Sequence, residues 1–109
     1  RLILADALAF AEQLAPAHIV DFATLTGSCV VALGQYTAGI FTPQDELARE
    51  FEAAAQRAGE PVWRLPLIRE LEREIASDVA DIKNTGGRFG GAISAALFLK
   101  RFVKRSHWL

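Results

Sequence analysis

The sequence contains no methionine, only one cysteine and only two histidines among its 109 residues. Because position 1 is arginine, we expect the chain to be a piece of a longer protein. The single cysteine excludes an internal disulfide and is typical of a reducing compartment. His18 and His107 lie far apart in the sequence, and no His-Glu-x-x-His pattern occurs. The sequence therefore predicts no self-contained metal site.

A surplus of basic residues and a long apolar run are also missing. The formal net charge is -1, which argues against a nucleic-acid partner because neutralising phosphates requires a basic surplus. No apolar run reaches the roughly 20 residues that span a bilayer, and no segment resembles a signal peptide. We therefore expect a soluble, cytoplasmic protein with neither a nucleic-acid nor a membrane partner. The hydrophobic content of 51% is high for so short a chain and suits part of a larger core.

Helical and extended patterns alternate along the chain, which predicts an α/β fold. Prolines and glycines end the helical patterns, and the apolar residues between them recur at helical spacing. Helices are expected at residues 1–15, 28–33, 43–58, 68–75 and 92–104, and strands at residues 18–25, 38–42 and 78–82.

The run at residues 19–25 is apolar on both faces, so we expect a central strand with neighbours on both sides. Residues 62–65 lie between two prolines and predict an extended connector that cannot be a central strand. We expect one domain, residues 1–109, that forms part of a three-layer sandwich with a mostly parallel central sheet covered by helices.

Two segments could carry function. Residues 24–27 follow the expected central strand, and ligands of open α/β sheets gather at the carboxyl ends of strands, although a plain strand-to-helix turn is the other interpretation. Residues 84–91 hold four glycines and predict a loop. Free amides there could bind an anion, so a small α/β anion-binding or assembly module using Gly86–Gly91 is an alternative function. The lysine of a Walker loop is absent, and a tight loop beside a neighbouring strand or subunit is favoured.

Three runs in a fixed order resemble one family of enzymes. Residues 1–8 read Arg-Leu-Ile-Leu-Ala-Asp-Ala-Leu, residues 21–28 read Asp-Phe-Ala-Thr-Leu-Thr-Gly-Ser, and residues 84–87 read Asn-Thr-Gly-Gly. This combination resembles the leucyl (cytosol) aminopeptidase family of two-metal exopeptidases, and the resemblance covers nearly the whole chain. The family's signature Asn-Thr-Asp-Ala-Glu-Gly-Arg-Leu carries metal-binding carboxylates, and this chain begins at its arginine.

The resemblance implies part of the catalytic domain of a metal-dependent aminopeptidase that hydrolyses leucine-like N-terminal residues from peptides. The parent enzyme is expected to hold two divalent ions, manganese or zinc, and to form a hexamer. The ligands of both ions precede Arg1 in the family, so we expect no metal in this chain and no activity from it alone.

The resemblance also assigns roles to individual residues. Arg1 matches a catalytic arginine that holds a bicarbonate ion, since its planar guanidinium can donate two parallel hydrogen bonds to such an anion. Thr24 and Gly27 match residues that line the pocket for the first substrate side chain. Leu25 matches a residue whose backbone carbonyl binds the peptide nitrogen, and Thr85 lies near the wall of the next pocket. We therefore expect Arg1 to lie near residues 24–27.

Overall fold

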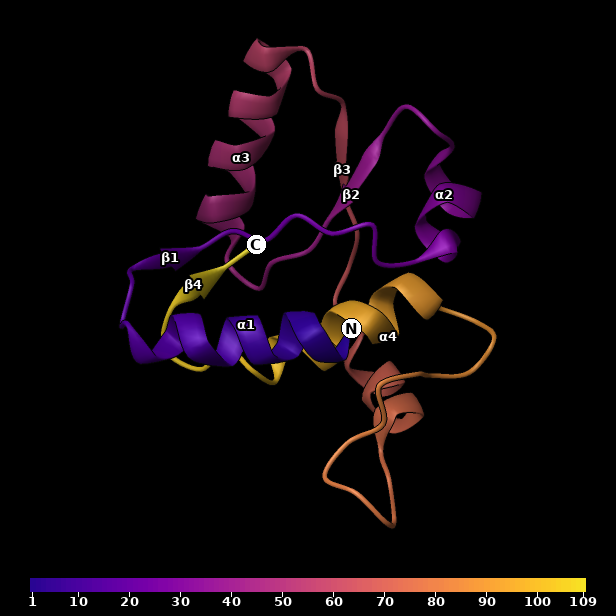
Figure 1. Ribbon diagram of the computed structural model, residues 1–109. Coiled ribbons are helices and arrows are strands. Elements are labelled where there is room, and N and C mark those ends of the chain that lie inside the picture. Colours follow the sequence, from indigo (N-terminus) through magenta and orange to yellow (C-terminus); the bar gives the residue numbers. More distant parts are fainter.

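The structure, a computed structural model, describes residues 1–109 and has mixed α/β architecture (Figure 1). Two pairs of parallel strands confirm the predicted class: β1 pairs with β4, and β2 pairs with β3. The elements in order are α1 (Leu2–Gln13), β1 (His18–Ile19), α2 (Gly27–Leu33), β2 (Ala38–Ile40), α3 (Asp45–Ala58), β3 (Val62–Arg64), the 3-10 helix η1 (Arg69–Ile75), α4 (Gly91–Lys100) and β4 (His107–Trp108).

Helix α4 forms the centre of the hydrophobic core. Its residues from Ser94 to Leu99 are all buried, as expected for a helix that is apolar on every side. Phe98 is 1% exposed and lies 5.1 Å, ring centroid to ring centroid, from Phe102. Helix α1 contributes Ala5 and Leu8 to the same core. The core therefore joins the two ends of the chain.

Helix α3 is the most amphipathic helix, and its end is the one predicted. Gly59 follows it with φ of 74°, the left-handed conformation in which glycine has no side-chain penalty. Its start differs, because the helix begins at Asp45 and not at residue 43. The hydroxyl of Thr42 accepts a hydrogen bond from the amide of Gln44 at 3.2 Å, so Thr42 stabilises the turn before the helix.

The prediction of a central strand at residues 19–25 is wrong for this chain. Only His18–Ile19 is a strand, and β4 is its only neighbour. No other strand of these 109 residues lies beside this segment, so Val20 and Phe22 stay 41% and 83% exposed. A periodic pattern reports how apolar a segment is but not which segments lie next to it.

The expected strand at residues 78–82 is also absent. The hydroxyl of Ser77 accepts hydrogen bonds from the amides of Val79 and Ala80 at 3.3 and 3.1 Å. This local turn replaces sheet pairing, and Val79 is 98% exposed. The extended connector at residues 62–65 is confirmed and contains β3, which is one strand of a two-stranded sheet. No pattern in the sequence indicated β4, a strand of two residues.

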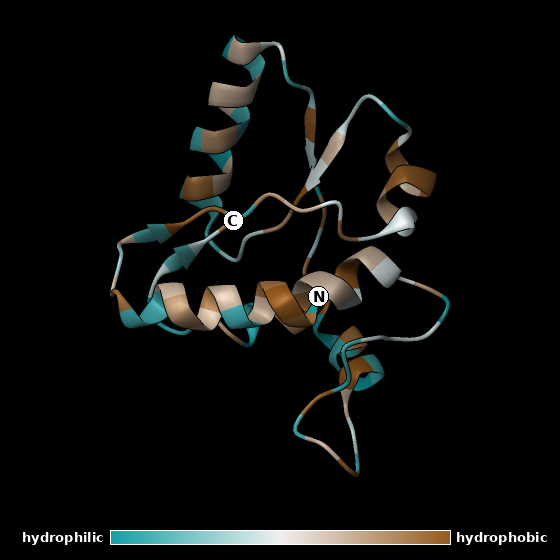
Figure 2. Ribbon diagram, in the orientation of Figure 1, coloured by the Kyte–Doolittle hydropathy of each residue, from teal (hydrophilic) through white to brown (hydrophobic).

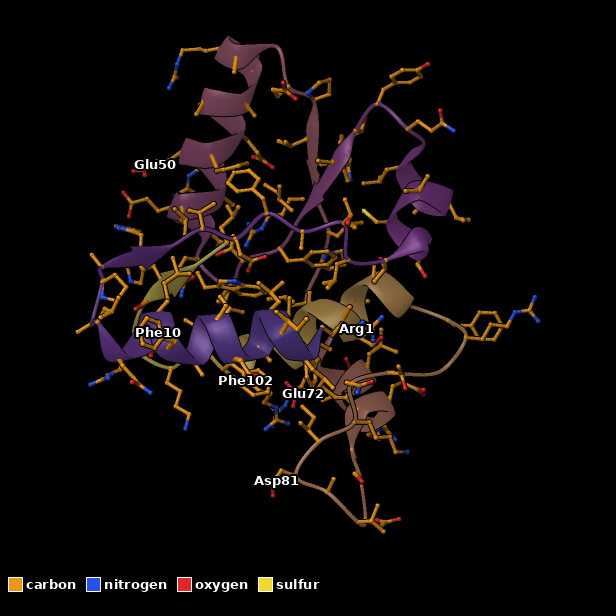
Figure 3. The ribbon with its side chains drawn as sticks, in the orientation of Figure 1. Arg1, Phe10, Glu50, Glu72, Asp81 and Phe102 are labelled. Carbon is orange, nitrogen blue, oxygen red and sulfur yellow. The ribbon has the colours of Figure 1, made fainter.

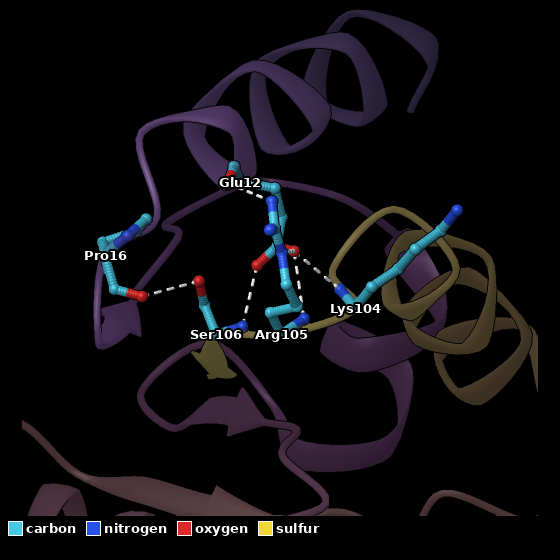
Figure 4. A network of polar contacts seen from close by, with 5 residues as sticks. All are labelled: Glu12, Pro16, Lys104, Arg105 and Ser106. Atoms are coloured by element: carbon cyan, nitrogen blue, oxygen red, sulfur yellow. Dashed lines mark hydrogen bonds and ion pairs between the residues drawn. The ribbon is translucent and has the colours of Figure 1, made fainter.

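Glu12 ties the end of α1 to the segment before β4 (Figure 4). Its carboxylate accepts hydrogen bonds from the amides of Lys104, Arg105 and Ser106, at 3.1, 3.0 and 2.8 Å. The hydroxyl of Ser106 donates to the carbonyl of Pro16 at 2.7 Å. We call these five residues the Glu12 clasp. It holds two segments together that are more than 90 positions apart.

The molecule exposes more surface than its mass predicts. Its accessible area is 7490 Å², whereas a self-contained protein of 11.9 kDa exposes about 5,900 Å². Apolar residues recur along α1 (Figure 2). Three of them are exposed: Leu2, Ile3 and Phe10. No helix has the length and apolar character needed to cross a membrane.

Candidate functional site

Arg1, Thr24 and Leu25 line one open hollow of about 540 Å³. Two segments form it, the start of α1 and the stretch between β1 and α2. The guanidinium of Arg1 and the hydroxyl of Thr24 are its polar side chains. Its other lining residues are apolar: Ile3, Leu4, Ala7, Phe22, Ala23 and Leu25. The hollow therefore combines an apolar wall with one positive charge.

Arg1 stands at the beginning of α1 (Figure 3). Most of the hydrogen-bonding capacity of its guanidinium is free. One guanidinium nitrogen donates to the backbone carbonyl of Asn84 at 2.6 Å. No carboxylate of the chain forms an ion pair with Arg1. A guanidinium has five N–H donors, so Arg1 can bind an anion while it keeps its bond to Asn84.

The segment from Thr24 to Gly27 is placed by its two ends. Asp21 precedes it, and a carboxylate oxygen of Asp21 accepts a hydrogen bond from Nε1 of Trp108 at 2.6 Å. Burial raises the pKa of Asp21, and the bond from Trp108 opposes that rise. At the other end, Thr26 caps α2, its hydroxyl accepting from the amide of Cys29 at 3.4 Å.

The other two predicted residues lie beside the hollow and are not among its lining. Gly27 is the first residue of α2, two positions after Leu25, and is exposed. A Cβ atom on Gly27 would meet no other atom within 4 Å. Thr85 is exposed and follows Asn84, which holds Arg1. The structure thus brings three of the five predicted residues into one hollow and sets two at its margin.

The glycine loop is filled by the protein itself. The amide of Gly87 donates to the carboxylate of Glu74 at 2.9 Å. A Cβ atom on Gly86 would lie 2.8 Å from the hydroxyl of Ser94. Gly90 has φ of 63° and immediately precedes α4, where a Cβ atom would contact the side chain of Leu71. Since a carboxylate already occupies one amide and would repel an anion, these contacts favour a tight loop over an anion site.

The two divalent ions implied by the resemblance do not fit the residues of this chain. No three side chains of histidine, cysteine, aspartate or glutamate lie close enough together to hold a metal ion. The hollow contains none of these side chains among its lining residues. What the lining residues offer is a positive charge at Arg1 and an apolar surface beside it.

Sequence reasoning missed two features of the hollow. The carbonyl of Asn84 orients Arg1, and no side-chain pattern signals a backbone acceptor. Phe22 belongs to the wall, but its place in an apolar run suggested burial inside a sheet. The alternation of exposed and buried positions after Ile19 depends on neighbours that the sequence does not specify.

Known proteins resemble this chain along its whole length. The model of the cytosol aminopeptidase family, catalytic domain, matches residues 1–109. A probable cytosol aminopeptidase of Synechococcus sp. (strain JA-3-3Ab) is 57% identical over 108 residues, which are 99% of this chain and 21% of that protein. The probable cytosol aminopeptidase of Aquifex aeolicus (strain VF5) is 55% identical over 94% of this chain and 21% of its own length.

A solved structure shows the same fold. A mutant of tomato leucine aminopeptidase superposes with a TM-score of 0.94 and 50% sequence identity. The match covers 96% of this chain and 21% of the tomato chain. The present chain thus spans about a fifth of the length of the relatives it matches.

Proposed function

The chain belongs to the cytosol aminopeptidase family, and on that premise we propose that it forms part of the catalytic domain of a leucyl-type aminopeptidase. The proposed reaction is hydrolysis of leucine-like N-terminal residues from peptides. The observation that carries the proposal is the hollow in which Arg1, Thr24 and Leu25 meet. An apolar wall with few polar groups is the usual construction of a pocket for an apolar side chain.

We assign each residue a part in binding or proton transfer. Thr24 and Gly27 border the space for the first substrate side chain, and the carbonyl of Leu25 accepts from the peptide nitrogen. Thr85 borders the next pocket. Arg1 would hold a bicarbonate ion through two parallel hydrogen bonds. Bound there, bicarbonate would supply a base for the proton of the attacking water.

The proposal also covers the metal ions, the location and the partners of the longer enzyme. Two divalent ions, manganese or zinc, would need ligands from residues outside this chain, because no three histidine, cysteine, aspartate or glutamate side chains of these 109 residues lie together. Several relatives are named cytosol aminopeptidases, which supports a cytoplasmic location for the parent enzyme. We further propose a homohexamer that acts on peptides, with no nucleic-acid or membrane partner.

Arg1→Ala in the longer enzyme tests the proposal. We expect kcat to fall by about 100-fold or more for every substrate, which is the usual contribution of a positioned acid–base group. Metal content should stay unchanged, since Arg1 is not a ligand. Arg1→Lys is the matched control: it keeps the charge but cannot form the bidentate bond, so it should recover little activity. Full activity of Arg1→Ala, measured on leucine p-nitroanilide, would contradict the assignment.

The isolated chain gives a second test. With manganese or zinc added, the pure 109-residue chain should not cleave leucine p-nitroanilide, because it has no group of three or more ligands that could hold a catalytic metal ion. If the homogeneous chain cleaved leucine p-nitroanilide, the catalytic groups would lie within it.

A further inference from the structure

We propose that His18 and His107 together form a surface site for a divalent transition-metal ion of the zinc, nickel and copper group. The two residues are register partners across the parallel strands β1 and β4. Their ring centroids are 5.2 Å apart and the rings are nearly perpendicular, at 76°. Metal–imidazole bonds of about 2.0–2.1 Å place two ligand nitrogens roughly 3 Å apart, so both rings must turn toward the shared ion to bind it.

Both imidazoles are free to accept an ion from solvent. His18 and His107 are exposed, whereas their neighbours Ile19 and Trp108 are buried. Side chains alternate between the two faces of a strand, so both histidines lie on the face opposite the core. The ion would sit at the surface, with water completing its coordination.

The backbone beneath the pair is fixed by hydrogen bonds. The amide of His107 donates to the carbonyl of Ala17 at 2.9 Å, and the amide of Leu109 donates to that of Ile19 at 3.0 Å. The amide of Asp21 in turn donates to the carbonyl of Leu109 at 3.0 Å. These bonds keep the two strands in register, and so keep the imidazoles side by side.

The Glu12 clasp holds the residues just before each strand. Ser106 precedes His107, and its hydroxyl donates to Pro16, which lies two residues before His18. Its amide is bound by the carboxylate of Glu12. A pair of ligands on so constrained a backbone loses little freedom when it binds an ion, which favours binding.

The pair is separate from the hollow at Arg1. The strands lie near the end of α1, and Arg1 stands at its start (Figure 1). A helix of 12 residues is about 18 Å long. The site therefore does not depend on the proposed peptidase activity, and the two proposals can fail separately.

Imidazole is a ligand that suits zinc, nickel and copper ions rather than magnesium or calcium. The chain contains no third histidine, so removing one ring cannot be compensated by another. Cys29 is the only thiol of the chain, and it must be replaced so that it does not contribute to the measured metal binding. The background for every measurement is accordingly the protein carrying Cys29→Ser.

The test is titration of Ni²⁺ by isothermal calorimetry into this background, His18→Ala, His107→Ala and the double variant. Each single substitution should weaken binding by at least ~10-fold, because it converts a two-point attachment into a single one. The double variant should bind little more weakly than either single variant, which is the non-additivity expected of two groups that share one ion. Glu50→Ala, which removes an exposed carboxylate on α3, is the control and should leave the affinity unchanged (Figure 3).

A second measurement tests the folded geometry. Only the folded chain holds the two rings together, so Ni²⁺ should raise the thermal unfolding midpoint of the background protein and not of the single variants. The proposal is overturned if either single variant keeps the background affinity, or if Ni²⁺ shifts every midpoint equally.

Discussion

The folded structure stabilises the ionised form of Glu12. Its pKa is lowered from 4.5 to about 2, chiefly because the side chain and amide of Ser106 lie against the carboxylate. Burial opposes this shift, and the amides of Arg105 and Lys104 add to it. Because the folded pKa lies below the unfolded one, ionised Glu12 stabilises the fold above about pH 4.5. This contribution is lost as the pH falls toward 2.

Glu12→Gln should therefore flatten the acid side of the stability profile. The amide keeps the shape of the side chain but cannot ionise, so the free energy of unfolding should change less between pH 5 and pH 2.5 than in the parent protein. Urea unfolding followed by circular dichroism measures this. Asp21 is unchanged in both proteins, and its raised pKa gives the opposite sign, a loss of stability as the pH rises through that pKa. Equal acid profiles for both proteins would rule out the role of Glu12.

Gly27 gives a prediction about substrate size. In the longer enzyme, Gly27→Val should lower kcat/KM for N-terminal leucine more than for N-terminal alanine, because the new side chain occupies the space proposed for the substrate. Its thermal stability should stay close to that of the parent, since a Cβ on Gly27 meets no atom within 4 Å. Gly27→Ala is the smaller control. An equal loss for both substrates would place Gly27 outside the pocket.

At the scale of elements, stability should depend on α4 far more than on the glycine loop. Phe98→Ala removes a ring that is 1% exposed and should destabilise the fold by about 3–5 kcal/mol. Phe89→Ala removes a ring that is 81% exposed and should change stability by less than about 0.5 kcal/mol. Denaturant unfolding of the two variants makes the comparison, and similar losses would contradict this placement of the core.

Helices were predicted better than strands because a helix is specified locally. The apolar stripe of α3 and the glycine after it lie within one segment, so its end is right and only its start moves, to Asp45. The run at residues 19–25 has an equally strong pattern, but a strand requires neighbours, and only Ile19 of this run pairs with β4. In the hollow, the motifs located Arg1 and Thr24, whereas the backbone carbonyl of Asn84 has no sequence signature.

On the scale of the whole molecule, exposed apolar surface should drive association. Ile3 and Phe22 are 86% and 83% exposed and both border the hollow. We expect the 109-residue chain alone to self-associate with rising concentration, because such patches are rarely stable in water. Ile3→Glu combined with Phe22→Ser should shift sedimentation toward the monomer, and Glu46→Gln is a control on an exposed polar position. A chain that stays monomeric at all concentrations would contradict this.

The Glu12 clasp and the pairing of β1 with β4 also determine when the fold can be completed. The hydrogen bonds of Glu12 join residues 92 to 94 positions apart, and β1 pairs with residues that are 89 positions away in the sequence. Contacts between such distant residues require closure of a long loop, which makes folding slow. During synthesis on a ribosome, α1 emerges before residues 104–109 and must wait for them before its end is anchored. Its apolar face is therefore exposed throughout that interval, the period in which a chaperone would bind it.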